Sequence, residues 1–382
     1  MTSTDYEDRE QTAVKHQILE RYLNGFAPIV GDWARDIAYV DCCAGPWKSS
    51  DPNLGDTSFG RAVGALRAAK SVLAQRGRTP TFRCLLIERN RNAFRELKRY
   101  CDTILDIEVT PWEWDFTKHV GDIEKFVKQR NDCFPFIFID PKGWDPLEID
   151  VIKPILRLQP GEVLINLMTS FITRFISVRE KRFERLFKED WSRLATLSGE
   201  EREEQIVASY ASRVREAGNF SYVCTLPVMK PSRDAFQFHM IYGTRHITGV
   251  KVFKETEKQI IPFMQRIRAE AQERRRYVRT GQSGLFGAHA FYKETRFTRF
   301  RTRSLEMTKA ELRARLQQSK QFSYDDAWAE AMTHSAVLED DLRSWLAEWK
   351  AARLVEITNE QPRQKFPARG REQVIIWKGA DA

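Results

Sequence analysis

Carboxylate side chains stand at the ends of short apolar runs in the first half of the chain. They are Asp41 in the run that starts at Ile37, Glu88 after Thr81–Ile87, and Asp140 after Phe134–Ile139. Continuous apolar runs of this length are typical of strands buried on both faces of a parallel sheet. Ligands of such sheets bind at the carboxyl ends of the strands. We therefore expect these carboxylates to meet a ligand at one edge of a sheet.

The segment after the first run has the composition of a loop that approaches a ligand. It reads Asp41-Cys42-Cys43-Ala44-Gly45-Pro46, and Gly45 lets the backbone come close without a Cβ collision. Asp41 could meet an ammonium group, directly or through water. Trp47 stands where the acid-x-x-x-Gly-x-Gly pattern has its second glycine, so an ordinary strand-to-loop turn stays open. We expect Asp41, Ala44, Gly45 and Pro46 to bind S-adenosylmethionine.

Two further acids suit an adenosine. Glu88 can accept two hydrogen bonds from ribose hydroxyls, although it follows Gly45 at a longer distance than in a compact unit. The long Lys48–Ser58 loop supplies much of the excess, and a surface glutamate that ends a strand is the alternative. Asp115 could meet the adenine amino group, or it could cap a helix that begins near Thr117.

The segment Phe138–Trp144 could hold an acceptor. Enzymes that methylate exocyclic amines of bases carry Asp/Asn-Pro-Pro-aromatic here, and the acid and the proline carbonyl accept the hydrogens of the amine. This chain has Asp140 and Pro141, then Lys142, and its aromatic Trp144 comes one residue late. We expect Asp140, Pro141 and Lys142 to form the catalytic site, and a strand-ending Asp-Pro turn is the alternative.

An arginine run, Thr295–Arg303, could contact nucleic acid. Its cations are Arg296, Arg299, Arg301 and Arg303, and Phe297 and Phe300 lie among them. In an extended chain, the last three of these arginines share one face. Such a face suits a phosphate backbone, with the aromatic rings available to stack on bases. A solvated strand or linker is the alternative.

The order of the elements predicts the fold. Apolar strand-like runs alternate with helical segments up to Glu162–Met168, which indicates a parallel sheet with helices on both faces. Two more strand-like runs, Phe220–Met229 and Phe236–Thr244, predict a terminal antiparallel hairpin. We expect an α/β, doubly wound, Rossmann-like class I methyltransferase sheet of seven strands. The domains would be 1–280, with a helical insertion at about 171–217, a basic linker at 281–303, and a winged-helix-like domain at 304–382.

The bulk composition narrows the class of protein. The 382 residues are 42% hydrophobic, enough for a core, and the net charge of +9 is compatible with nucleic acid without establishing it. Six cysteines without a CxxC pair, and histidines without ligand spacing, argue against a metal site and a disulfide framework. The polar N-terminal segment and the absence of a long apolar run predict no membrane association and a cytoplasmic protein.

Taken together, these blocks resemble the three-Cys-motif partner proteins, a bacterial and phage-associated family. The resemblance rests on YVDCCAGP, FIFIDPKGW, EVLINLMTSFITRF (Glu162–Phe175) and YGTRHITGVKVFK (Tyr242–Lys254), with Lys15 and Tyr22 in the N-terminal helix. It implies a methyltransferase-like fold and a partner with a three-cysteine motif that resembles radical-SAM proteins. This chain lacks that motif, so it would be the companion.

Two hypotheses of function follow. The first is an S-adenosylmethionine-dependent methyltransferase that acts on nucleic acid. The second is a methyltransferase-derived scaffold without catalysis that binds nucleic acid or a partner protein, and Trp47 and Lys142 favour it. A nicotinamide oxidoreductase is the weaker third, because an ordinary dinucleotide-binding sheet would continue with parallel units instead of a hairpin.

Overall fold

The computed structural model describes residues 10–45, 49, 51, 54–176, 180–281, 294–360 and 364–379. The chain divides into two compact units, Met1–Phe291 and Tyr292–Ala382. The strands of the first unit are β1 (Asp36–Asp41), β2 (Thr81–Ile87), β3 (Glu108–Trp112), β4 (Cys133–Ile139), β5 (Glu162–Leu167), β6 (Tyr222–Met229) and β7 (Phe236–Thr244). Its helices are α1 (Glu10–Gly31), α2 (Ser58–Gln75), α3 (Arg91–Cys101), η2 (Phe116–Lys118), α4 (Val120–Lys128), η3 (Asp145–Leu147), α5 (Ile149–Leu156), α6 (Thr169–Phe175), α7 (Glu180–Phe187), α8 (Asp190–Thr196), α9 (Gly199–Gly218) and α10 (Ile247–Thr280).

The seven strands form one sheet in the order β3-β2-β1-β4-β5-β7-β6. Strands β1 to β5 are parallel, and β7 runs antiparallel to both of its neighbours, β5 and β6. This is the order of the class I methyltransferase sheet, so the Rossmann-like α/β prediction is confirmed. The first, fourth and fifth strands are buried along their whole length, which explains their unbroken apolar sequences.

The third strand lies later in the chain than the apolar pattern predicts. The predicted run Ile104–Val109 begins in the turn after α3, and Leu105 is 93% exposed. The strand instead pairs with β2 from Glu108, opposite Arg83, to Trp112, opposite Ile87. Pairing with the neighbouring strand therefore decides its bounds, and local hydrophobicity does not.

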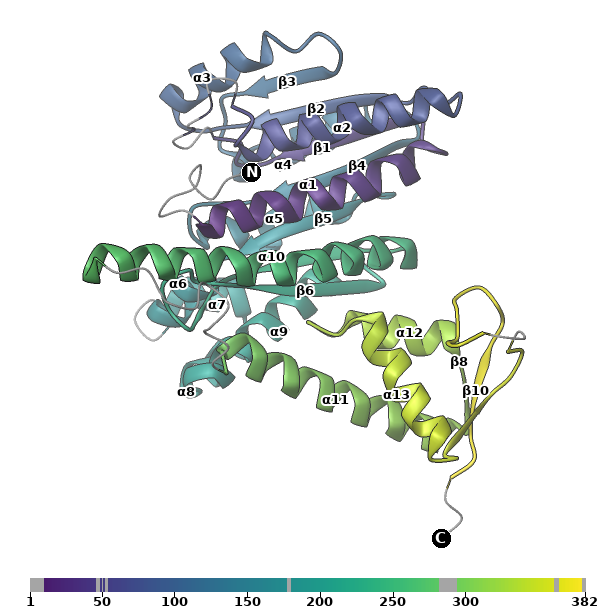
Figure 1. Ribbon diagram of the computed structural model, residues 1–382. Helices are drawn as coiled ribbons and strands as arrows, with labels where there is room; N and C mark the ends of the chain where they lie inside the picture. Colours follow the sequence, from purple (N-terminus) through teal and green to yellow (C-terminus); the bar gives the residue numbers. More distant parts are fainter. Residues whose placement is uncertain are drawn as a thin grey trace. The chain divides into compact units, whose positions relative to one another are not determined.

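Helices cover both faces of the sheet (Figure 1). On one face, α1 packs against α2 and α10. On the other face, α4, α5 and α9 pack with alternate strand residues such as Val40 and Ile137 into one hydrophobic cluster. The helices α6 to α9 lie between β5 and β6, where the sequence predicts a helical insertion.

A buried polar network ties α1 to the sheet. Tyr22 of α1 donates a hydrogen bond to Glu162 at the start of β5 and lies 2.6 Å from the hydroxyl of Tyr242. Thr244 donates to the same carboxylate over 2.8 Å. Burial raises the pKa of Glu162, and its hydrogen-bond donors oppose that shift. The network closes against Gly249 in the first turn of α10, where no room exists for a side chain.

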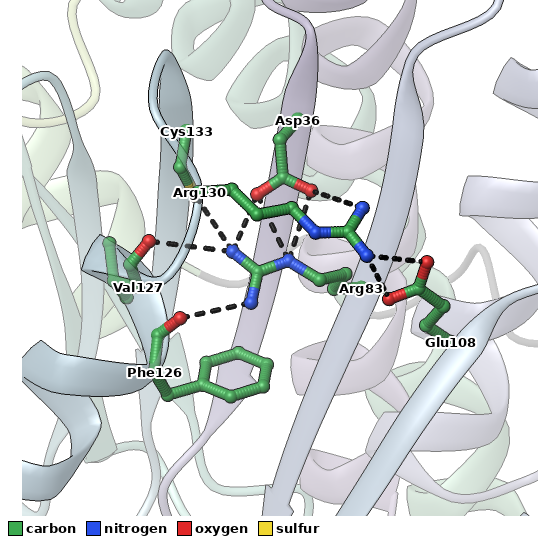
Figure 2. A network of polar contacts seen from close by, with 7 residues as sticks. All are labelled: Asp36, Arg83, Glu108, Phe126, Val127, Arg130 and Cys133. Atoms are coloured by element: carbon green, nitrogen blue, oxygen red, sulfur yellow. Dashed lines mark hydrogen bonds and ion pairs between the residues drawn. The ribbon is translucent and has the colours of Figure 1, made fainter.

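A second buried network lies at the amino-terminal edge of strands β1, β2 and β3 (Figure 2). Arg83 of β2 forks onto Asp36 of β1 with three hydrogen bonds of 2.6 to 3.0 Å. It also donates to the carbonyl of Phe126 over 2.9 Å, and its guanidinium stacks over that ring. Arg130 joins Asp36 to Glu108 of β3. Loss of one partner of such a buried pair costs about 3–5 kcal/mol, so this network stabilises the register of the sheet.

The second unit is built from helices and a small antiparallel sheet. Its elements are α11 (Arg296–Ser319), β8 (Gln321–Ser323), α12 (Tyr324–Thr333), α13 (Glu339–Ala351), β9 (Val355–Ile357) and β10 (Val374–Trp377). The strands pair in the order β8-β10-β9. Its core contains Leu312, Leu316, Trp328, Leu346, Trp349 and Ile375. Three helices followed by two late strands is the outline of a winged-helix domain, and this unit has that order with β8 in addition. The winged-helix assignment itself stays a prediction.

The expectation of an extended basic linker at 281–303 is wrong for its last part. Residues from Arg296 onward form the first turns of α11, and Thr295 and Thr298 cap that helix reciprocally. Phe297, Ser304 and Thr308 share a buried face of the helix, since their spacing follows the helical period. The division between the units falls between Phe291 and Tyr292.

The sequence also predicts no membrane association, no metal site and no disulfide framework. Across the described ranges, no helix combines the length and apolar character needed to cross a membrane. None of the six cysteines, all of which lie within the described residues, forms a disulfide, and five of them are buried. Within the same ranges, no cluster of three or more acidic, histidine or cysteine side chains is arranged for a metal ion.

The closed network around Glu162 generates a stability prediction. In Gly249→Ala, the new Cβ would lie 2.3 Å from the Tyr242 hydroxyl and 2.4 Å from Glu162 Oε1. We expect a loss of about 2 kcal/mol or more in the free energy of unfolding, measured by urea denaturation. Gly64→Ala in α2 is the matched control, because nothing lies within 4 Å of its added Cβ. There the better helix propensity should stabilise the chain by up to about 1 kcal/mol. Equal effects in the two variants would contradict the packing argument.

Candidate functional site

Two neighbouring cavities lie at the carboxyl edge of the sheet and share Cys43, Asp140, Pro141 and Lys142. Glu88, Trp114 and Asp115 belong to the first cavity, together with other residues from the ends of β1, β2, β3 and β4. The second cavity adds Lys15, His16, Ala44, Ser58 and Asn166, from α1, the β1 loop, α2 and β5. Most of the predicted site residues of the first unit therefore meet in one place.

The loop after β1 is held against the end of β2. The amide of Ala44 donates to the carbonyl of Ile87 over 2.8 Å, and the amide of Gly45 donates to Glu88 Oε2 over 3.1 Å. Gly45 has a φ of 79°, a conformation that glycine adopts without strain. The sequence predicts that Pro46 binds the cofactor and that Trp47 replaces the second glycine of the loop pattern. Both residues lie outside the described residues.

Asp41 supports this loop from beneath. Its carboxylate is fully buried and accepts hydrogen bonds from the Tyr39 hydroxyl, the Cys43 amide and the Ser58 hydroxyl at 2.9 to 3.1 Å. Burial raises its pKa to about 6, against the opposing effect of these donors. Asp41 is not among the described residues that line either cavity, so its contact with a ligand ammonium stays a prediction.

Glu88 is the carboxylate best placed for a polar ligand in the first cavity. It is 3% exposed, and its two oxygens accept from the amides of Gly45 and Asn90, at 3.1 and 2.6 Å. A carboxylate offers about four lone-pair positions, so acceptor capacity remains for two ligand hydroxyls. Asn90 in turn caps the N-terminus of α3.

Asp115 fills the role that the sequence left as the alternative. It accepts hydrogen bonds from the amide and hydroxyl of Thr117, at 3.1 and 2.7 Å, and so caps η2. It also lines the first cavity, so a cap and a ligand contact are compatible. Beside it, Trp114 packs between the rings of Trp112 and His119, with centroids 4.4 and 4.1 Å away. The aromatic wall of the first cavity is therefore rigid.

Asp140 is already engaged by two other parts of the chain. Lys15 of α1 makes an ion pair with its Oδ2, and Asn166 of β5 donates to its Oδ1 over 2.6 Å. The other amide atom of Asn166, Oδ1, is buried, and no described residue donates a hydrogen bond to it. A buried acceptor without a donor is costly in a folded protein, and such atoms often face a ligand or an ordered water.

The sequence analysis included Lys15 and Asn166 in the family blocks but assigned neither of them a role in the site. Lys15 lies 125 positions before Asp140, so no local pattern connects the two residues. The feature that could have indicated its role is its position two helical turns before Tyr22, on the face of α1 that packs on the sheet. Asn166 is a polar residue in an otherwise apolar strand, which marks it as a candidate for a strand-end site.

His16 adds a neutral imidazole to the second cavity. Burial lowers its pKa to about 3, and the neighbouring ammonium of Lys15 acts in the same direction. The ring is therefore uncharged over the physiological range.

The arginine run belongs to the second unit and is organised differently from the prediction. Because residues 296–303 are helical, Arg296, Arg299 and Arg303 share one side of α11, and Arg301 points elsewhere. Arg301 forms a two-pronged ion pair with Asp341 of α13 at 2.8 and 2.9 Å, and Arg296 is 7% exposed. The expected extended face of Arg299, Arg301 and Arg303 is therefore wrong, and Arg301 at least stabilises the unit.

The chain was compared with known proteins. No protein-family model matches it, and no curated protein matches it. Among solved structures, a Legionella pneumophila protein of family DUF519 aligns with 66% of this chain and 92% of its own at 12% identity, with a TM-score of 0.39. A loganic acid methyltransferase solved with SAH aligns over 69% of this chain and 88% of its own at 10% identity, with a TM-score of 0.32. At these TM-scores neither likeness carries an argument, and the methyltransferase-like fold rests on the strand order.

The buried histidine generates a prediction of pH dependence. The folded chain holds His16 at a pKa of about 3, whereas an unfolded histidine has about 6.5. Below pH 6.5 the unfolded chain thus binds a proton that the folded chain does not, so stability falls as the pH decreases. We expect His16→Gln to lose about 2 kcal/mol less than the parent between pH 7 and pH 5, measured by urea denaturation. Asp41 titrates in both chains and cancels in this comparison. Parallel pH curves would contradict the assignment.

Proposed function

We propose that this chain is an S-adenosylmethionine-dependent methyltransferase-like protein that acts on nucleic acid together with a three-cysteine-motif partner. The observation that carries the proposal is the meeting of Glu88, Asp115, Asp140 and Lys142 in two joined cavities at the carboxyl edge. This edge of a doubly wound sheet is where nucleoside cofactors bind. When bound, the cofactor would supply an electrophilic methyl group on a sulfonium.

The first cavity fits the adenosine part. Glu88 would accept from the two ribose hydroxyls while it keeps its bonds to Gly45 and Asn90. Trp114 and Asp115 would flank the adenine, the indole by its face and the carboxylate by accepting from the amino group. Ala44 lines the second cavity, so the loop that it forms with Gly45 would border the methionine part.

The second cavity fits an acceptor group that carries hydrogens. Asp140 is oriented by Lys15 and Asn166, and Asn166 Oδ1 adds a buried acceptor beside it. An amine nitrogen held by such acceptors would be aligned with the methyl group, and alignment would supply most of the rate enhancement. Asp140 would exchange its bond to Lys15 for one to the acceptor.

The alternative is a scaffold that has lost catalysis. The ion pair between Lys15 and Asp140 favours it, because an internal ammonium occupies the position that an acceptor amine needs. Lys142, in place of an aromatic or proline, adds a second cation to both cavities. Under this alternative, the chain binds nucleic acid or a partner without methyl transfer.

The partner part of the proposal comes from the sequence blocks. The chain itself lacks a three-cysteine motif, and its cysteines are mostly buried thiols whose pKa values are raised by burial. Such thiols are poor metal ligands as they stand. A partner would therefore have to supply any cluster chemistry.

Cofactor binding tests the role of Glu88. Isothermal titration calorimetry with S-adenosylmethionine should give measurable binding to the full chain. Glu88→Gln should weaken that binding about 10- to 100-fold, because one charged acceptor of the ribose hydroxyls is lost. Glu96→Gln, at an exposed position of α3, is the matched control and should leave the affinity unchanged. A parent chain that binds no cofactor would remove the proposal.

Methyl transfer separates the enzyme from the scaffold. With methyl-labelled cofactor and total RNA or DNA, the parent chain should transfer label, and Asp140→Asn should lower the rate at least about a hundredfold. Asp150→Asn, exposed on α5, controls for the loss of a carboxylate. Nucleic-acid binding without transfer in the parent, unchanged in Asp140→Asn, would establish the scaffold instead.

A further inference from the structure

The last turns of α10 extend beyond the sheet on the same side as the cavities. α10 begins after β7 at the amino-terminal edge and runs back along α1 (Figure 1). The sulfur of Met264 accepts from the amide of Met229, at the end of β6, so the helix passes the carboxyl edge near that residue. Arg268 then donates to the carbonyls of Lys230 and Arg233 in the turn beyond the strand.

The end of α10 is exposed all round. A partly buried ion pair between Arg274 and Glu10 fastens the helix to the start of α1. From Arg275 to Thr280 every residue is exposed, including Tyr277 at 58% and Val278 at 85%. At 1.5 Å per residue, the helix continues about 18 Å past Arg268. Helical residues exposed on every side cannot be explained by packing of this unit.

The exposed end is strongly basic. Its sequence from 275 to 280 reads Arg-Arg-Tyr-Val-Arg-Thr and has no carboxylate. Arg274 to Arg276 form a run of three arginines shortly before the end of the helix. A row of exposed arginines such as Arg275, Arg276 and Arg279 matches a row of phosphates in charge and in donor geometry.

Further cations lie at the same edge of the sheet. Arg174 follows β5 in α6, and Lys230 and Arg233 form the β6–β7 turn. Partial burial lowers the pKa of Lys230, and the positive charges of Arg233 and Arg174 act in the same direction, while the carboxylate of Glu203 opposes them. Asp234 lies 3.7 Å from Arg268. Phe171, 40% exposed, lies on the same helix as Arg174.

We propose that this basic rim, made of Arg174, Lys230, Arg233, Arg275, Arg276 and Arg279, binds the phosphate backbone of a single-stranded nucleic acid and leads a base toward the second cavity. The proposal rests on the proposed function, since it names where the nucleic-acid substrate binds. It places that contact in the first unit and not on the arginine run of α11 in the second unit. A single strand is favoured because Tyr277 and Phe171 offer exposed rings, on which unpaired bases stack.

The test measures binding of fluorescein-labelled 20-nucleotide single-stranded RNA and DNA to the full chain by fluorescence anisotropy, between 50 and 300 mM KCl. The variant R275Q/R276Q/R279Q should bind at least about tenfold more weakly at low salt, and its log Kd against log salt slope should fall by about 2. Tyr277→Ala should weaken binding about fivefold or more. Urea denaturation of each variant shows that it folds.

The matched control is R78Q/R95Q/R99Q, which removes the same charge at exposed positions of the β2–β3 half of the unit. It should change the affinity less than twofold. Three results would each contradict the proposed single-strand site at the rim. They are equal weakening by the two triple variants, tighter binding of a 20-base-pair duplex, and binding to phosphatidylserine vesicles without oligonucleotide binding. Calorimetric binding of S-adenosylmethionine without oligonucleotide binding would also overturn the rim and leave the proposed cofactor site standing. Rim-dependent binding without cofactor binding would do the reverse.

Discussion

The parallel pairing of β1 with β2 and β4 determines where the candidate site lies. Asp41, the last residue of β1, is in register with Leu86 on one side and Phe138 on the other. Glu88 and Asp140 therefore each stand two residues beyond that line, on either side of the β1 loop. A slip of one residue would reverse the faces of a whole strand, and the buried Asp36–Arg83 pair at the opposite edge disfavours such a slip. One end of the sheet thus protects the geometry of the other.

Helix α1 carries this order into the second cavity. Tyr22 holds the helix to Glu162 at the start of β5, and two turns earlier Lys15 reaches Asp140 at the end of β4. The segment before the sheet therefore sets the charge of the second cavity. Because the ammonium neutralises Asp140, the cavity holds a cation that a ligand of Asp140 would have to displace. The same contact makes both the enzyme and the scaffold chemically reasonable.

Positive charge is distributed unevenly in the two units. In the second unit, three cations of α11 form ion pairs with the other helices. Arg301 and Lys309 pair with Asp341 and Glu348 of α13, and Arg315 pairs with Glu330 of α12. These ion pairs help to hold α12 and α13 in place. At the end of α10, the helix outruns the sheet and its arginines lie on an exposed surface. An arginine motif in a sequence can therefore either hold helices together or lie on an exposed surface, and the fold decides between the two.

The sheet, its terminal hairpin and the presence of Glu88 and Asp140 at one edge could all be predicted from the sequence. These follow from local burial patterns and from the rule that parallel strands end on the same side, so no long-range contact had to be known. The start of β3, the pairing of Asp140 with Lys15 and Asn166, the cap made by Asp115 and the helix capped by Thr295 are known only from the structure. The start of β3 and the contacts of Asp140 depend on groups distant in sequence, whereas the two caps are local. Groups distant in sequence meet only when packing brings their elements together. A residue such as Asp115 can either cap a helix or contact a ligand, and its residue type alone does not distinguish the two roles.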